Sequence, residues 1–145
     1  MKSMLLLLAS RFLAWPFFII SLWILYRGHN LPGGGFIGGL IGASGFLFFD
    51  LSGYGRPERG LFSFKPLSFL SVGLSLAILS GLPGLLTGAG FLKAFWLPGF
   101  SLPLLGSVHL GTPLIFDVGV YLTVIGFILL LAGTMADHQG QEEVE

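Results

Sequence analysis

The 145-residue sequence has little charge: only 10% of its residues are Asp, Glu, Lys or Arg, and seven basic residues balance seven acidic ones. A soluble domain carries about 25% charged residues, so this chain has too few to cover a compact fold with a wettable surface. Its net charge of zero provides no basic footprint for nucleic acid. Because 54% of the residues are hydrophobic, the composition indicates an integral membrane protein.

Cysteine is absent, which excludes disulfides, thiolate nucleophiles and thiolate metal sites. The three histidines, at positions 29, 109 and 138, show no metal-ligand spacing, and no Ser, His and acid are arranged as a nucleophilic set. A glycine run opens one helix, but no Lys and Ser/Thr follow it in the register of a phosphate-binding loop. We therefore predict no catalytic residue, no cofactor and no metal site, and we expect the protein not to be an enzyme.

Long apolar runs predict an all-α membrane protein with four transmembrane helices. The expected spans are 4–26, 34–51, 66–86 and 113–135, each near the ~20 residues that a bilayer requires. The second span is short and rich in glycine. Together they form one transmembrane domain over residues 1–136, followed by a polar, acidic tail at 137–145 that we expect to be frayed.

The segment 87–112 is apolar but broken by glycine and proline, so its uninterrupted pieces are too short to span a membrane. Lys93, Phe95 and Trp96 favour a segment at headgroup level, where aromatic rings and ammonium groups settle. The alternative is a re-entrant loop packed inside protein, because irregular backbone cannot face lipid.

Glycines are concentrated where the first span ends and the second begins. Three of them follow Pro32, and three recur every four residues, which places them on one helical face where another backbone can approach closely. The glycines expected to serve helix packing are Gly33, Gly34, Gly35, Gly38 and Gly42. We expect that face to lie flush against the backbone of another protein in lipid, which would make the chain an obligate component of a larger assembly.

Basic residues predict the orientation. With a cytoplasmic N-terminus, Lys2, Arg56, Arg59 and Lys65 lie inside, whereas Arg27 and Lys93 lie outside, which fits the positive-inside tendency. We expect the protein to lie in the plasma membrane. Because the number of spans is even, both termini are then expected in the cytoplasm.

Six polar residues are candidates for an ion path or for buried polar contacts: Arg27, His29, Asn30 and Asp117 on the outer side, and Arg11 and Asp50 on the inner side. A carboxylate at membrane depth is costly unless it is paired. Arg27 is the nearest candidate partner of Asp117 by depth, with His29 next, and Arg11 with Asp50 is a similar pair. For His29 the alternatives are a proton relay and a loop hydrogen bond, and for Asp117 they are a transport role and a salt bridge.

Two motifs give the chain a specific resemblance. The run RGHNLPGGGFIGGL at 27–40 and the run GTPLIFDVGVY at 111–121 resemble the B subunit of the Mrp-type (Mnh) multisubunit cation/proton antiporters. Related domains occur in membrane-bound hydrogenases and in the large A subunit of those antiporters. The matching positions are Gly28, His29, Asn30, Pro32, Gly33, Gly34, Gly35 and Phe36, then Gly111, Thr112, Pro113, Phe116, Asp117, Gly119 and Tyr121.

The resemblance implies a small subunit of an assembly that exchanges Na+ for H+ across the membrane. Its partners would be the other subunits, including large complex I-like subunits that carry the proton channels, together with membrane lipid. The chain would pack between larger subunits and contribute polar groups to the ion path. The alternatives are a purely structural scaffold of the same complex and a membrane subunit of a related hydrogenase.

Overall fold

The computed structural model describes residues 4–28, 33–51, 65–96, 100–102, 106–108 and 111–142. They form four helices and one small hairpin. The elements are α1 (Met4–Gly28), α2 (Gly34–Leu51), α3 (Pro66–Leu86), β1 (Phe100–Leu102), β2 (Gly106–Val108) and α4 (Thr112–Glu142). The expectation of a helical membrane fold with a glycine-rich second helix is confirmed.

Three of these helices are long and apolar enough to cross a membrane. The spanning parts are Leu8–Gly28 in α1, Pro66–Leu86 in α3 and Thr112–Met135 in α4. The second helix, α2, is a shorter apolar helix of 18 residues, near the lower limit of ~17 residues for a transmembrane helix. Its glycines let the neighbouring helices approach closely, as described below.

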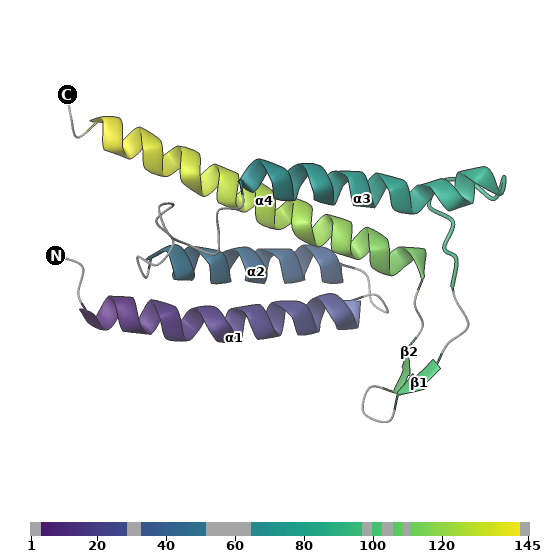
Figure 1. Ribbon diagram of the computed structural model, residues 1–145, viewed down its shortest axis with the longest axis horizontal. Coiled ribbons are helices and arrows are strands. Elements are labelled where there is room, and N and C mark those ends of the chain that lie inside the picture. Colours follow the sequence, from purple (N-terminus) through teal and green to yellow (C-terminus); the bar gives the residue numbers. More distant parts are fainter. Residues whose placement is uncertain are drawn as a thin grey trace.

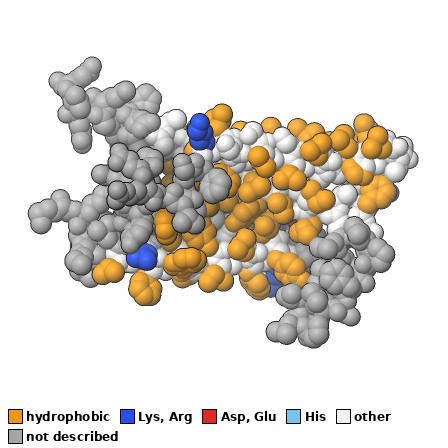
Figure 2. Space-filling model, viewed as in Figure 1, with side chains coloured by type: hydrophobic (Ala, Val, Ile, Leu, Met, Phe, Trp, Pro, Cys, Tyr) orange, Lys and Arg blue, Asp and Glu red, His pale blue; other side chains and the backbone are white. Residues whose placement is uncertain are grey.

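Successive helices run in opposite directions, and α4 occupies the centre of the arrangement (Figure 1). Along its length α4 contacts α3, α2 and, over a short stretch, α1, while α1 packs along α2. Ala43, Tyr121 and Ile125 form the small buried core at the place where α2 meets α4. Elsewhere most large apolar side chains face outward, and the face shown in Figure 2 is largely hydrophobic with Lys and Arg only at its margins. Such a surface suits a lipid environment.

The hairpin β1–β2 was not predicted from the sequence. Its two strands pair antiparallel, with Phe100 opposite Val108, and a further bridge joins Trp96 to Gly111. It lies at the end of the bundle where α4 begins (Figure 1). A two-stranded ribbon has unpaired edges, which cannot face lipid in the hydrocarbon of a bilayer. Both interpretations of the segment 87–112, at headgroup level or packed inside protein, keep such edges away from lipid, so the headgroup-level placement stays a prediction.

The C-terminal tail differs from expectation over most of its length. We expected fraying from Asp137, but α4 continues to Glu142. No proline interrupts this stretch, and it includes the good helix formers Ala136, Gln141 and Glu142. The helix is therefore extended beyond the span that ends at Met135.

Candidate functional site

A buried polar junction joins three helices through Ser21 of α1, Gly38 and Gly42 of α2, and Tyr121 of α4. Glycine makes this junction possible because a side chain would separate the helices. A β-carbon at Gly38 would lie 3.0 Å from the carbonyl oxygen of Ser21. At Gly42 it would lie 2.8 Å from Ser21 Oγ and 2.9 Å from the Tyr121 hydroxyl.

Two hydrogen bonds link the three helices across this junction. Ser21 Oγ donates to the carbonyl oxygen of Gly38 at 2.8 Å, and Ser21 Oγ lies 2.8 Å from the Tyr121 hydroxyl. A serine hydroxyl has a single proton, so Tyr121 donates to Ser21 when Ser21 donates to Gly38. Ser21 is fully buried, so these bonds satisfy polar groups that water does not reach.

The sequence pointed to only part of this junction. Gly38, Gly42 and Tyr121 lay in the singled-out stretches, but Ser21 was missed. A serine inside an apolar span must find an acceptor, and that rule could have marked Ser21. It could not have chosen Ser21 over Ser10, which is also buried in α1.

Asp117 lies where α4 passes over the start of α2. It is five residues into α4, or about 7 Å along the axis, and its side chain is partly buried. A β-carbon on Gly35 would overlap the Asp117 carbonyl oxygen. Gly35 and Asp117 belong to different sequence motifs, and the fold brings their backbones into direct contact.

The glycines at the start of α2 have two different roles. Gly34 packs on Gly28, backbone to backbone, so the end of α1 and the start of α2 touch. Gly33 is exposed and has a φ of +94°, a conformation that residues with a β-carbon rarely adopt. Its carbonyl accepts the first helical bond, from Ile37 N at 3.0 Å. Gly33 thus shapes the turn into α2, whereas its neighbours serve close packing.

The neighbour of the α2 glycine face is the chain itself. Gly38 meets α1 and α4, while Gly39 would place a β-carbon 2.8 Å from Val124 of α4. Gly45 faces Phe17 and Phe18 of α1. Another protein therefore cannot lie on this face without displacing α1 or α4.

The remaining candidate residues lie near the ends of the helices. The Arg27 guanidinium carbon is 5.3 Å from the centroid of the Trp23 ring, so Arg27 contacts an aromatic face. His29 and Asn30 lie outside the described residues. Arg11 is exposed on the first half of α1, and Asp50 is exposed at the end of α2.

Among the side chains that the structure describes, the charged ones are Arg11, Arg27, Asp50, Lys65, Lys93 and Asp117. They lie toward the ends of the helices, whereas the middle of the bundle offers hydroxyl groups and backbone carbonyls. Transporters usually gather several polar groups and broken helices around a site at the membrane midplane. The described part of the chain thus lacks a continuous row of ionisable groups and can supply only part of an ion path.

Comparisons with known proteins agree with this arrangement. Residues 5–130 match the family described as "Domain related to MnhB subunit of Na+/H+ antiporter". The chain is 39% identical to the B subunit of the Na(+)/H(+) antiporter of Alkalihalophilus pseudofirmus over 117 residues, 81% of each protein. It is also 33% identical to the probable K(+)/H(+) antiporter A/B subunit of Rhizobium meliloti, where the match covers 83% of this chain but 12% of that protein.

A solved structure gives the same result in three dimensions. The chain superposes on part of the Mrp complex from Dietzia sp. DQ12-45-1b with a TM-score of 0.66 and 36% sequence identity. The match covers 86% of this chain and 13% of the longer chain in that complex. The sequence match and the shared fold together place the chain in the MnhB family of antiporter B subunits.

Proposed function

We propose that the chain is the small membrane subunit of a multisubunit Na+/H+ antiporter. The observation that carries this proposal is the family match over residues 5–130, which includes both motifs. These motifs meet in the fold, because Gly35 of the first lies against Asp117 of the second. The shared residues thus build one contact between α2 and α4. The test is to delete the gene for this chain and measure Na+-dependent proton movement in everted vesicles, and undiminished exchange would contradict the proposal.

We propose that the direct neighbour is a large antiporter subunit of the A type. In the Rhizobium meliloti relative, the matching region is part of one long protein whose name combines A and B. Two modules joined in one chain have a high effective concentration and commonly contact each other. Co-purification in mild detergent tests this neighbour. Recovery with hydrogenase subunits instead would redirect the assignment to the related hydrogenases.

We propose that Asp117 supplies a carboxylate to the outer end of the ion path, together with His29 and Asn30. An acid inside a membrane span is a functional candidate by default. Asp117→Asn keeps the shape of the side chain but removes its charge. The expected result is an assembled complex whose exchange rate is about 100-fold lower, the scale of losing one positioned proton-transfer group. Asp137→Asn, which follows the span that ends at Met135 and is not among the candidates, is the matched control and should exchange normally.

A scaffold role is the second candidate, and the scarcity of charged side chains in the middle of the described helices favours it. On this interpretation Asp117→Asn exchanges at the wild-type rate, while substitutions at the helix contacts dissociate the complex. The two functions therefore differ in one measurement, the exchange rate of an intact Asp117→Asn complex. A normal rate would remove Asp117 from the ion path.

We also propose a plasma-membrane orientation with both termini in the cytoplasm. The beginning of α1 and the end of α4 lie at the same end of the bundle (Figure 1). The chain contains no cysteine, so a single cysteine introduced at Lys65 or Lys93 is the one thiol in this chain that can be labelled. In intact cells a membrane-impermeant maleimide should label Lys93→Cys and spare Lys65→Cys. The reverse pattern would invert the orientation.

A further inference from the structure

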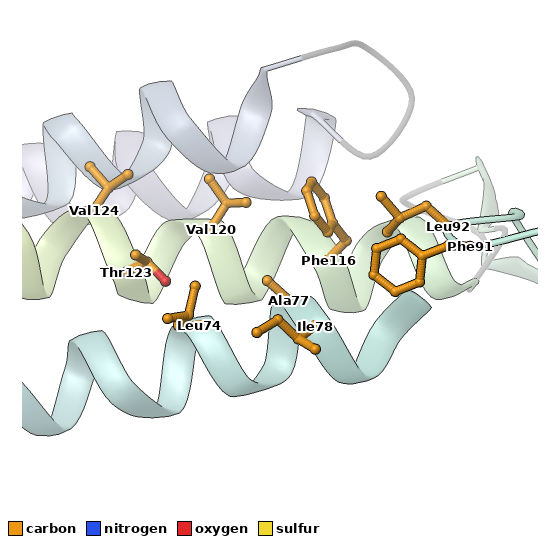
Figure 3. Close-up of a pocket in the computed structure, with 9 residues that line it drawn as sticks. All are labelled: Leu74, Ala77, Ile78, Phe91, Leu92, Phe116, Val120, Thr123 and Val124. Atoms are coloured by element: carbon orange, nitrogen blue, oxygen red, sulfur yellow. The ribbon is translucent and has the colours of Figure 1, made fainter. Parts of the chain in front are cut away.

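A groove of about 300 Å³ runs between α3 and α4 and extends to Val124, which also packs on Gly39 of α2. Figure 3 shows Leu74, Ala77 and Ile78 on the side of α3 that faces α4, with the loop side chains of Phe91 and Leu92 at one end. The residues that define its walls are Leu74 and Ile78 of α3, Phe116 and Val120 of α4, and Phe91 and Leu92 of the loop.

The groove offers an occupant almost no polar group. Its only hydroxyl among the lining side chains is that of Thr123, which already donates to the carbonyl oxygen of Gly119 at 2.8 Å. A ligand that needed hydrogen bonds would find none to replace those it makes with water. An apolar ligand would regain the dispersion contacts that an empty groove lacks. The chemistry of the walls therefore selects a hydrocarbon.

The loop after α3 places two apolar side chains, Phe91 and Leu92, at one end of this groove. Gly90 has a φ of +100°, and Leu92 has a φ of +63°, which is rare for a residue with a β-carbon. Gly81 of α3 leaves the space that the Phe91 ring fills, since a β-carbon there would lie 2.8 Å from Phe91 Cζ. These backbone features hold two apolar side chains over the groove at a conformational cost.

Polarity increases toward the same end. A smaller cavity of about 180 Å³ shares Leu92 and Phe116 with the groove and is also lined by the hydroxyl-bearing residues Ser80 and Thr112. Lys93 directly follows Leu92 and is exposed, as are the nearby rings of Phe95 and Trp96. Aromatic rings and lysines at one level mark the headgroup region of a bilayer. From the groove toward Lys93, the chain offers apolar side chains first, then hydroxyl groups and finally an ammonium group. This order is complementary to a phospholipid, read from its acyl chains to its phosphate.

We propose that this groove binds one acyl chain of an anionic phospholipid, whose phosphate pairs with Lys93. The charge of Lys93 is complementary to that phosphate. A partner helix fits less well, because a helix with its side chains is about 10 Å wide and Phe91 and Leu92 narrow one end of the groove. The proposal needs only that the chain spans a membrane, so it does not depend on ion exchange.

The experiment is photo-crosslinking of the intact complex. The purified complex is reconstituted in vesicles of phosphatidylcholine with phosphatidylglycerol that has a diazirine on one acyl chain, and labelled peptides are mapped by mass spectrometry. Labels are expected on Ile78 and Phe116. Val120→Phe fills the groove and should lower this labelling about tenfold, the effect of losing contact with a few methylene groups. Leu131→Phe, on the exposed side of the same helix, should leave it unchanged.

The headgroup is tested separately. Lys93→Gln should lower labelling about fivefold, the scale of one lysine near an anionic membrane surface, whereas Lys65→Gln at the start of α3 should not. Labelling by a diazirine phosphatidylcholine probe should be the same with and without Lys93→Gln.

Native gels check that each variant complex is intact. If Val120→Phe fails to assemble, Ile78→Trp fills the groove from its other wall. Equal labelling of filled and unfilled grooves, or crosslinks from the groove to another protein of the complex, would overturn the proposal.

Discussion

The two contact regions of α4 achieve close packing by different means. The three-helix junction with α1 and α2 combines glycines with hydrogen bonds that pass from helix to helix through Ser21 and Tyr121. The seam with α3 depends on small residues, which are Gly73 and Ala77 of α3 and Gly119, Thr123 and Gly126 of α4. There the hydroxyl of Thr123 donates to a carbonyl of its own helix.

The difference shows what each region contributes. In lipid the hydrophobic effect does not drive helices together, so association depends on van der Waals packing and on interhelical hydrogen bonds. Among the residues that the structure describes, the seam shows the first of these and the junction shows both. Close packing alone tolerates sliding along the helix axis, whereas a hydrogen bond with fixed partners sets the register. We expect the junction to fix the position of α4 and the seam to fasten α3 onto it.

The largest effect is expected from Gly119→Leu in the seam. A β-carbon at Gly119 would lie 2.6 Å from Ala77 N and 2.8 Å from the carbonyl oxygen of Gly73. Both neighbours are backbone atoms that cannot rotate away, so α3 must separate from α4. We expect a loss of more than ~3 kcal/mol in the free energy of unfolding, the upper range for overpacked sites. The measurement is the thermal midpoint of the detergent-solubilised complex.

The matched control for this substitution is on the same helix. Gly133 has open space around it, and a β-carbon placed there would meet no atom within 4 Å among the described residues. Gly133→Leu should therefore stay within ~0.5 kcal/mol of the wild type, as surface substitutions usually do. Equal midpoints for Gly119→Leu and Gly133→Leu would show that the seam is not a close contact.

A smaller loss is expected from Ser21→Ala in the junction. The change removes the acceptor of the Tyr121 hydroxyl and one donor to the Gly38 carbonyl. Buried polar groups left without a partner cost ~1–3 kcal/mol, and we expect the lower half of that range here. Ser44 donates to the carbonyl of Leu40 in its own helix, at 2.9 Å and exposed. Ser44→Ala is thus the control, and a loss as large as that of Ser21→Ala would contradict a special role for the junction.

The helices were predictable because their signals are local. Apolar runs of about twenty residues and prolines at helix starts mark spans in one dimension. The glycine spacing of α2 likewise showed that backbone would meet backbone. Which helix supplies that backbone is a three-dimensional matter, and the neighbours are α1 and α4 of the same chain.

The hairpin and the polar partners were harder to predict. Strands of three residues, such as Phe100–Leu102, are too short to show an alternating pattern. Depth along the membrane gave Arg27 as a candidate partner of Asp117, and that pair stays a prediction. The contact of Arg27 with the Trp23 ring, one turn earlier on α1, is a separate contact that was not predicted from the sequence. It depends on the direction of side chains around the helix, which depth along the membrane does not give.

The smallest effect is expected from removing single hydroxyl groups on α4. Which of the two losses of stability is larger gives the finest test of the difference between the junction and the seam. Tyr121→Phe removes a bond between helices, for which ~0.6 kcal/mol is typical in membrane proteins. Thr123→Val keeps the shape of the side chain and removes only a bond to Gly119 of the same helix. We expect Thr123→Val to change the thermal midpoint less than Tyr121→Phe does. Because both residues are on one helix and pack against different neighbours, the reverse ranking would mean that hydrogen bonding does not distinguish the two regions.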